Sequence, residues 1–361
     1  MAGELKAEIS REFVFSLGMA IESIEPAFSA ERFGKELLDS TWTDLELKAR
    51  LQRVATVLGD VLACEYPHSI ALLKEVAGRF SGLPALVFPE YVAQFGLGYW
   101  DVSIEGLAFF TSISSSEFAV RPFIRRDPEV MMQQMLVWAD NDNFHVRRLA
   151  SEGCRPRLPW ASPLRRFIKD PSLVLPILER LRADSEEYVR RSVANNLNDI
   201  SKDHPDLVMQ LAQEWYGDSR DVDRVVKHGL RSLLKRGDTK ALLLFGYENP
   251  EKVQIDNLQI ANGILHIGES GKVRFDLVLQ GKSKAKLRLE YAVYYLKANG
   301  KTSKKIFQAG EYEFMPGVHT IEKKQSFRQM TTRKHYPGKH GLSVIVNGRE
   351  MAVVEFDLLA E

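Results

Sequence analysis

Three consecutive segments of the sequence share one pattern, and this repetition constrains the fold more than any other feature. They span residues 127–153, 170–200 and 204–237. Each begins with Asp-Pro or His-Pro, continues through an apolar helical stretch and an acidic turn, and ends in a second helix that opens with Val-Arg-Arg or Val-Val-Lys. Proline in the first turn costs no hydrogen bond, because that N–H would be unpaired anyway. The pattern predicts a solenoid of HEAT-like helical hairpins.

The segments before these repeats carry the same periodicity in a less regular form. Apolar residues recur at helical spacing in 44–63, 67–80, 89–96 and 104–110, with Gly and Pro between the segments. We expect these segments to form earlier hairpins of the same all-α array.

The periodicity changes after Pro250, from 3.6 residues to two. Val273, Phe275, Leu277 and Leu279 alternate with residues that are mostly polar, which is typical of a strand with one buried face. Asn-Gly pairs at 299–300 and 347–348 lie between alternating segments and indicate tight hairpins. The sequence therefore predicts an immunoglobulin-like β-sandwich, without the usual cysteine pair. We expect a HEAT-like-repeat domain at 1–249 and the sandwich at 250–361.

Charge is distributed unevenly between these two parts. Residues 251–361 contain 18 Lys and Arg against 12 Asp and Glu, a net charge of +6, which leaves −5 for residues 1–250. Arginine outnumbers lysine by 17 to 4 within 121–236, and its planar fork suits bidentate contacts with phosphate. A row of arginines on a solenoid favours binding along a nucleic-acid backbone. Alternatively, these arginines are ordinary side chains on solvent-exposed helix faces and bind no nucleic acid.

Several functional classes lack their sequence signatures. The chain has no P-loop, dinucleotide fingerprint, HExxH or Gly-x-Ser-x-Gly motif. Its eight histidines are scattered, and its two cysteines, Cys64 and Cys154, have no close metal-binding partners. We therefore expect no metal and no cofactor. Because no secretory signal or membrane-spanning apolar run is apparent, we expect a cytoplasmic protein without membrane contact.

Four stretches of the helical part resemble one enzyme family. They are residues 45–50 (LELKAR), 115–123 (SSEFAVRPF), 145–160 (HVRRLASEGCRPRLPW) and 189–199 (VRRSVANNLND). They are similar to the AlkC branch of the bacterial AlkC/AlkD alkyl-base DNA glycosylases, one subgroup of which carries an immunoglobulin-like domain after its repeats. The resemblance implies hydrolysis of the N-glycosidic bond of 3-methyladenine, 3-methylcytosine and 1-methyladenine in duplex DNA, with little or no base flipping.

The residue types in these stretches fit that chemistry. A base made cationic by alkylation leaves as a neutral molecule, so no general acid has to protonate it. The remaining task is to stabilise a sugar with oxocarbenium character and to position water, for which carboxylates are suited. We expect Glu117, Glu152 and Asp199 to do this. Trp160 follows two prolines in a segment that cannot be a regular helix interior, and we expect it to stack on the lesion or the sugar.

Each of these four residues also has an ordinary structural interpretation. Glu152 could pair with Arg148 one helical turn away, and Asp199 could cap a helix end. Glu117 could belong to a capping box, and Trp160 could be a packing residue. Only their joint placement in the family-like stretches favours the catalytic interpretation.

Basic residues in the same stretches and in the sandwich are the expected DNA contacts. We expect a monomer that grips alkylated duplex DNA with the solenoid and clamps it with the sandwich. A non-catalytic HEAT scaffold that binds DNA or a protein is the rival hypothesis. The expected contacts are Arg121, Arg147, Arg148, Arg155, Arg157, Arg190, Arg191, Lys227, Lys304, Lys305, Arg333 and Lys334.

Overall fold

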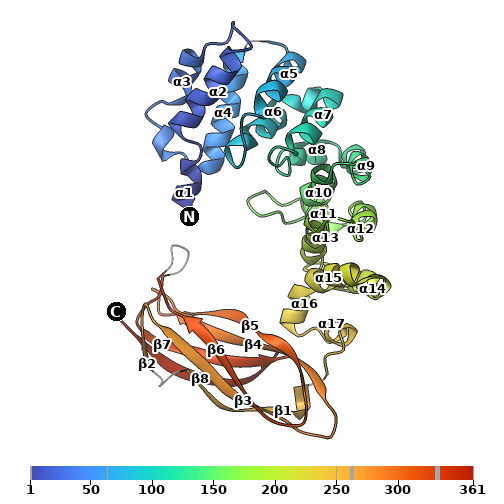
Figure 1. The fold of residues 1–361 in the computed structure, drawn as a ribbon, viewed down its shortest axis with the longest axis vertical. Coiled ribbons are helices and arrows are strands. Elements are labelled where there is room, and N and C mark those ends of the chain that lie inside the picture. Colours follow the sequence, from blue (N-terminus) through green and yellow to red (C-terminus); the bar gives the residue numbers. More distant parts are fainter. Residues whose placement is uncertain (1, 63, 249, 261–263, 330–333, 361) are drawn as a thin grey trace. The chain divides into compact units, whose positions relative to one another are not determined.

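The computed structural model describes residues 2–62, 64–248, 250–260, 264–329 and 334–360, and it divides by Cα proximity into two compact units. The first comprises residues up to 208 together with 214–229, and the second comprises 209–213 and 230–361. The helices come first in the chain and the strands follow (Figure 1), as predicted. The helices before the repeats are α1 (Ala2–Ala7), α2 (Arg11–Glu22), α3 (Ala30–Leu37), α4 (Leu47–Leu62), α5 (Tyr66–Ala77), α6 (Val87–Phe95), α7 (Trp100–Phe110) and α8 (Val120–Arg126).

The three repeats each form the predicted pair of helices. They are α9 (Pro128–Trp138) with α10 (Phe144–Gly153), α12 (Leu175–Leu181) with α13 (Glu187–Ile200), and α14 (Pro205–Trp215) with α15 (Arg220–Gly229). The Asp127 side chain caps α9 by accepting from the Val130 N–H at 3.1 Å, while Pro128 occupies the first turn. A short helix, α11 (Arg165–Lys169), precedes the second repeat. The second helices α10, α13 and α15 pack in one row, and α9 and α12 lie beside this row, to its right in Figure 1.

The first arginine of each Val-Arg-Arg motif joins neighbouring repeats. The Arg147 guanidinium donates to both carboxylate oxygens of Asp184, at 2.6 and 3.0 Å, and to two carbonyls in its own repeat. Arg190 repeats this arrangement: it donates to the carbonyls of Asp184 and Ser185 and pairs with Asp221 at 3.2 Å. These two arginines were expected to contact DNA, but the structure uses them to hold the repeats in register. We therefore no longer assign them to phosphate.

The second unit is a sandwich of two sheets. Its strands are β1 (Val253–Ile260), β2 (Ile264–His266), β3 (Ser270–Leu279), β4 (Ala285–Leu296), β5 (Thr302–Phe314), β6 (Gly317–Ser326), β7 (Gly338–Val346) and β8 (Arg349–Leu359), and the short helices α16 (Arg231–Arg236) and α17 (Thr239–Leu244) belong to the same unit. The sheets have the orders β1-β3-β6 and β2-β8-β7-β4-β5. Both sheets contribute to one apolar core, which includes the predicted inward side chains of β3.

The predicted hairpin at residues 347–348 is confirmed. Asn347 has φ 48° and Gly348 has φ 77°, and the two residues join β7 to β8 directly. Two central residues with positive φ make a type I′ turn, whose twist matches that of antiparallel strands. The pair at 299–300 lies in the longer connection between β4 and β5, where Gly300 also has positive φ.

Close packing around α10 gives a test of the repeat core. A Cβ atom on Gly153 would lie 2.5 Å from Val120 Cγ2 and 3.1 Å from Met135 Cε. We expect Gly153→Ala to lower the free energy of unfolding by about 1–3 kcal/mol, the usual cost of overpacking, measured as the shift of the urea midpoint. The matched control is Gly78→Ala, because a Cβ there meets nothing within 4 Å. Equal midpoints for the two variants would contradict this account of the packing.

Candidate active site

The three predicted carboxylates lie in one continuous chain of alternating charges. Arg148 Nη1 lies 2.8 Å from Glu117 Oε2, and Arg148 Nη2 lies 3.6 Å from Glu152 Oε1. Arg155 continues the chain, with Nη1 2.6 Å from Glu152 Oε1 and Nε 2.9 Å from Asp199 Oδ2. Lys202 ends it, 3.0 Å from Asp199 Oδ1. We call these six residues the carboxylate–arginine chain. It connects the segment before α8 with α10 and α13.

Burial explains why the charges alternate. Glu152 is 5% exposed and Asp199 2% exposed, and an unpaired carboxylate at such depth would pay a large desolvation cost. Glu152 also receives a hydrogen bond from Ser192 Oγ at 2.7 Å on its second oxygen. The pairing of Glu152 with Arg148 suggested from sequence is present, but it is one contact of several. Asp199 likewise binds two cations instead of acting only as a helix cap.

Glu117 is the most accessible of the three carboxylates, with 15% of its side chain exposed against 7% for Glu152 and 3% for Asp199. Its Oε2 accepts hydrogen bonds from Arg148 and from Ser115 Oγ, the latter at 3.0 Å. The Glu117 N–H donates to the same hydroxyl. These contacts fix the carboxylate close to the surface, where it can meet a substrate.

Trp160 projects from the loop that follows α10. The residue is 60% exposed and has φ 62°, a left-handed conformation that is costly for a residue with a bulky side chain. Its exposure rules out the packing role considered from sequence. Pro156 and Pro159 restrict the backbone of this loop, and the exposed face of the indole is available for stacking on a flat ligand.

The buried side chain of Arg121 fixes this loop through hydrogen bonds to its backbone carbonyls. Its guanidinium donates to the carbonyls of Gly153 and Arg155, both at 3.0 Å, and of Ser162 at 2.9 Å. Burial, with a further contribution from the positive charge of Arg125, lowers the pKa of Arg121 to about 10, so the group stays charged at neutral pH. Because Arg121 is 2% exposed, the expectation that it contacts DNA is replaced by a structural role.

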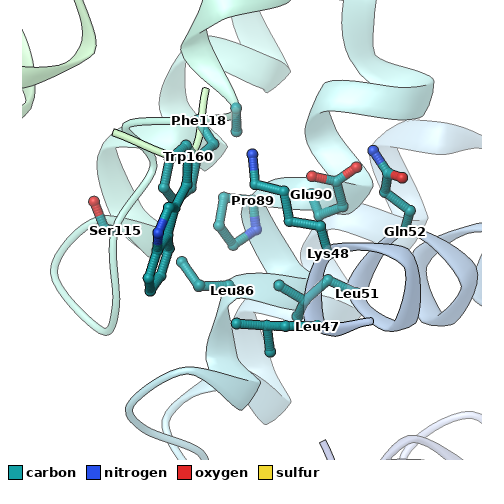
Figure 2. A pocket seen from close by; sticks show the side chains of 11 residues that line it. Leu47, Lys48, Leu51, Gln52, Leu86, Pro89, Glu90, Ser115, Phe118 and Trp160 are labelled. Carbon is teal, nitrogen blue, oxygen red and sulfur yellow. The ribbon is translucent and has the colours of Figure 1, made fainter. Parts of the chain in front are cut away.

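A pocket lies beside the carboxylate–arginine chain and has Trp160 as one wall (Figure 2). Side chains of helices α4 and α6 form the other side, and Ser115 and Phe118 also line the pocket. Ser115 connects the pocket to the chain, because its hydroxyl donates to Glu117. The aromatic wall and the carboxylates therefore belong to one site.

The other expected DNA contacts differ in their accessibility. Arg148 lies mostly inside the site, where its guanidinium also stacks on Tyr188, 4.7 Å from the ring centre, and Arg155 is buried. We therefore place both in the carboxylate–arginine chain instead of on a phosphate.

The remaining expected contacts are more accessible. Arg157 pairs with Asp203 but is partly exposed, Lys227 is half-buried, and Arg333 lies outside the described residues. The exposed cations are Arg191, Lys304, Lys305 and Lys334.

Four residues in or around the carboxylate–arginine chain were missed by reasoning from sequence. Lys202 contacts Asp199 through its ammonium group, and Ser115, Ser192 and Tyr188 contact the site through a hydroxyl or a ring. Both serines lie within the stretches that carried the family resemblance, but nothing in a serine's local sequence shows which carboxylate it faces. Tyr188 precedes the second Val-Arg-Arg motif, and only the packing of α13 on α10 brings it to Arg148.

The described part of the chain contains no cluster of three or more His, Cys, Asp or Glu residues arranged to hold a metal ion. Among the described helices, none has the length and apolar character needed to cross a bilayer.

Comparison with known proteins identifies the family. Residues 114–236 match the model of the family described as DNA alkylation repair enzyme, and residues 254–360 match that of the YhaZ C-terminal Ig-like domain. The chain is 43% identical to an uncharacterised protein, YhaZ, of Bacillus subtilis over 98% of its length and 99% of that protein. It superposes with a TM-score of 0.93 on the Pseudomonas fluorescens alkylpurine DNA glycosylase AlkC bound to DNA containing an abasic site analogue, at 38% identity and with 98% and 99% of the two chains covered. The chain belongs to the AlkC branch of the DNA alkylation repair enzymes.

This membership confirms two predictions from sequence, the AlkC resemblance and the immunoglobulin-like domain that follows the repeats. The match to the DNA alkylation repair family begins three residues before Glu117 and includes every carboxylate of the carboxylate–arginine chain. Trp160 lies within the same range. The family region of this AlkC-branch chain therefore contains the carboxylate–arginine chain and Trp160, whereas the pocket walls on α4 and α6 lie before it.

The Arg155 guanidinium should be essential for folding of the site. We expect Arg155→Met to lower the free energy of unfolding by about 3–5 kcal/mol, because it leaves Glu152 and Asp199 buried without their shared cation. The control is Arg157→Met in the same loop, where loss of the more exposed pair with Asp203 should cost about 1 kcal/mol or less. Urea unfolding followed by circular dichroism measures both. A similar cost for the two variants would refute the assigned role.

Proposed function

We propose that this chain is a monofunctional DNA glycosylase that hydrolyses the N-glycosidic bond of cationic alkylated bases, namely 3-methyladenine, 3-methylcytosine and 1-methyladenine. The observation that carries the proposal is the carboxylate–arginine chain beside an exposed Trp160, within the region that matches the DNA alkylation repair enzymes. The solved AlkC relative is described as an alkylpurine DNA glycosylase.

The chemistry needs stabilisation of charge more than proton donation. When the glycosidic bond breaks, its electron pair neutralises the cationic base, and the sugar acquires oxocarbenium character. A water molecule then bonds to the sugar carbon and releases a proton to solvent. The Glu117 carboxylate, the most exposed of the three, faces the sugar. Glu152 and Asp199 add negative potential behind it, and preorganised charge of this kind acts without reorganisation during the reaction.

Binding of duplex DNA involves both units in this proposal. The exposed cations of the solenoid and the sandwich bind phosphates, and the duplex bends so that Trp160 reaches the lesion or sugar with little or no flipping of the base. The sandwich acts as a clamp, and the protein works as a monomer in the cytoplasm. The solved relative is bound to DNA containing an abasic site analogue, which supports DNA as the ligand.

A non-catalytic scaffold remains the second hypothesis, because solenoids commonly bind macromolecules without acting on them. Release of free base from methylated duplex DNA distinguishes the two, since only an enzyme produces it. Chromatography of the supernatant after incubation with the purified protein measures that release.

The carboxylates should act on rate more than on affinity. We expect Glu117→Gln and Glu152→Gln each to lower single-turnover excision by about 10²–10³-fold, the usual effect of removing one preorganised electrostatic group, with duplex affinity nearly unchanged. The control is Glu129→Gln, which replaces an exposed carboxylate on α9 that pairs with Arg166. Wild-type excision by both site variants would remove these carboxylates from the mechanism.

Replacing an exposed cation should instead change the affinity for duplex DNA and the dependence of that affinity on salt. We expect Arg191→Ala and Lys305→Ala each to weaken binding to every duplex and to reduce the salt slope by roughly one, because each lost phosphate contact releases one counterion fewer. Arg147→Ala serves as the comparison, since that arginine pairs with Asp184 and should leave the slope unchanged. Fluorescence anisotropy across a salt series measures the slopes. A wild-type slope for Lys305→Ala would argue against the clamp.

A further inference from the structure

The pocket beside Trp160 has the shape of a slot with an apolar lining (Figure 2). The indole forms one wall, and the side chains of Leu47 and Leu51, from α4, lie across from it. Leu86 and Pro89 complete the apolar surface. Two facing walls of this kind suit a flat ring, because stacking and apolar contact both act on the faces of such a ring.

The slot also contains two charged groups with hydrogen-bonding capacity that no described residue uses. Glu90 Oε1 accepts from Gln94 Nε2 at 3.1 Å, and within the described residues no group donates to Oε2. Lys48 Nζ lies over the Phe118 ring at 4.8 Å, and no described carboxylate lies within ion-pair distance of it. Both residues line the slot, and in Figure 2 Lys48 lies between the indole of Trp160 and the Glu90 carboxylate.

The slot therefore presents one acceptor and one donor beside an apolar surface. Burial raises the pKa of Glu90 against the effects of Gln94 and Lys48, and burial lowers the pKa of Lys48. The Glu90 side chain is half-buried, whereas Lys48 is exposed to solvent. A ligand in the slot can therefore accept from Lys48 and donate to Glu90 in place of water.

An adenine ring has the complementary edge, since its exocyclic amine donates next to a ring nitrogen that accepts. We propose that the slot binds the free alkylated adenine base released by the enzyme. The Glu90 carboxylate accepts from the amine, the Lys48 ammonium donates to the ring nitrogen, and Trp160 covers one face of the ring. This inference rests on the proposed glycosylase function. Ser115 borders the slot and contacts Glu117, so the base moves only a short way from the sugar.

Equilibrium dialysis of free 3-methyladenine against the full-length protein tests the slot without DNA. We expect measurable binding to the wild type and about tenfold weaker binding for Lys48→Met and for Glu90→Met, the effect of losing one hydrogen bond to a charged group. Trp160→Leu should weaken binding as well. The controls are Lys35→Met and Glu75→Met, which make the same substitutions on exposed faces of α3 and α5 and should bind like the wild type.

Either of two results would overturn the inference: no binding by the wild type at the solubility limit of the base, or wild-type affinity in Lys48→Met or in a folded Glu90→Met. Because Lys48 is exposed, its replacement keeps the test valid if Glu90→Met fails to fold. Base release from methylated duplex, measured on the same preparations, separates the two proposals. Release without free-base binding rejects the slot alone, whereas free-base binding without release rejects the glycosylase.

Discussion

The candidate site depends on one buried guanidinium, that of Arg155, which bonds Glu152 on α10 and Asp199 on α13. Loss of this shared partner would remove the nearest cation from each buried carboxylate, which is costly at such depth. Arg155 itself lies in an irregular loop, and that loop is held through its carbonyls by the buried Arg121. The charges of the candidate site, the packing of adjacent repeats and the position of Trp160 therefore depend on the same few hydrogen bonds.

The repeats use arginine for two purposes that the sequence does not separate. In each Val-Arg-Arg motif the first arginine ties one repeat to the acidic turn of the next, as Arg147 does with Asp184. The second arginine points away from this contact between repeats: Arg148 enters the site, and Arg191 is exposed. A helix turns by about 100° per residue, so adjacent arginines necessarily point in different directions and meet different partners. A motif repeated for structural reasons thus also provides a charge to the site.

Periodicity and turn chemistry are local properties, and this is why the helical hairpins, the alternation in β3 and the turn at Asn347-Gly348 could be predicted. The three carboxylates were found because they lie in family-like stretches, and the structure brings them together. The role of Arg121 could not be predicted, because its burial depends on a loop about 40 residues away. Lys48 and Glu90 were missed for a similar reason, since α4 and α6 meet only in the folded chain.

The balance of charge in the site resolves an apparent conflict between its acidity and a polyanionic ligand. Three carboxylates alone would repel DNA, and residues 1–250 already carry a net charge of −5. Within the carboxylate–arginine chain, however, Arg148, Arg155 and Lys202 match the three acids in number. At the distance of a phosphate the chain is close to neutral, whereas in the proposed complex the charge nearest to the sugar is the Glu117 carboxylate. Under this proposal, pairing each acid with a cation lets the backbone approach while keeping negative charge where the sugar becomes positive.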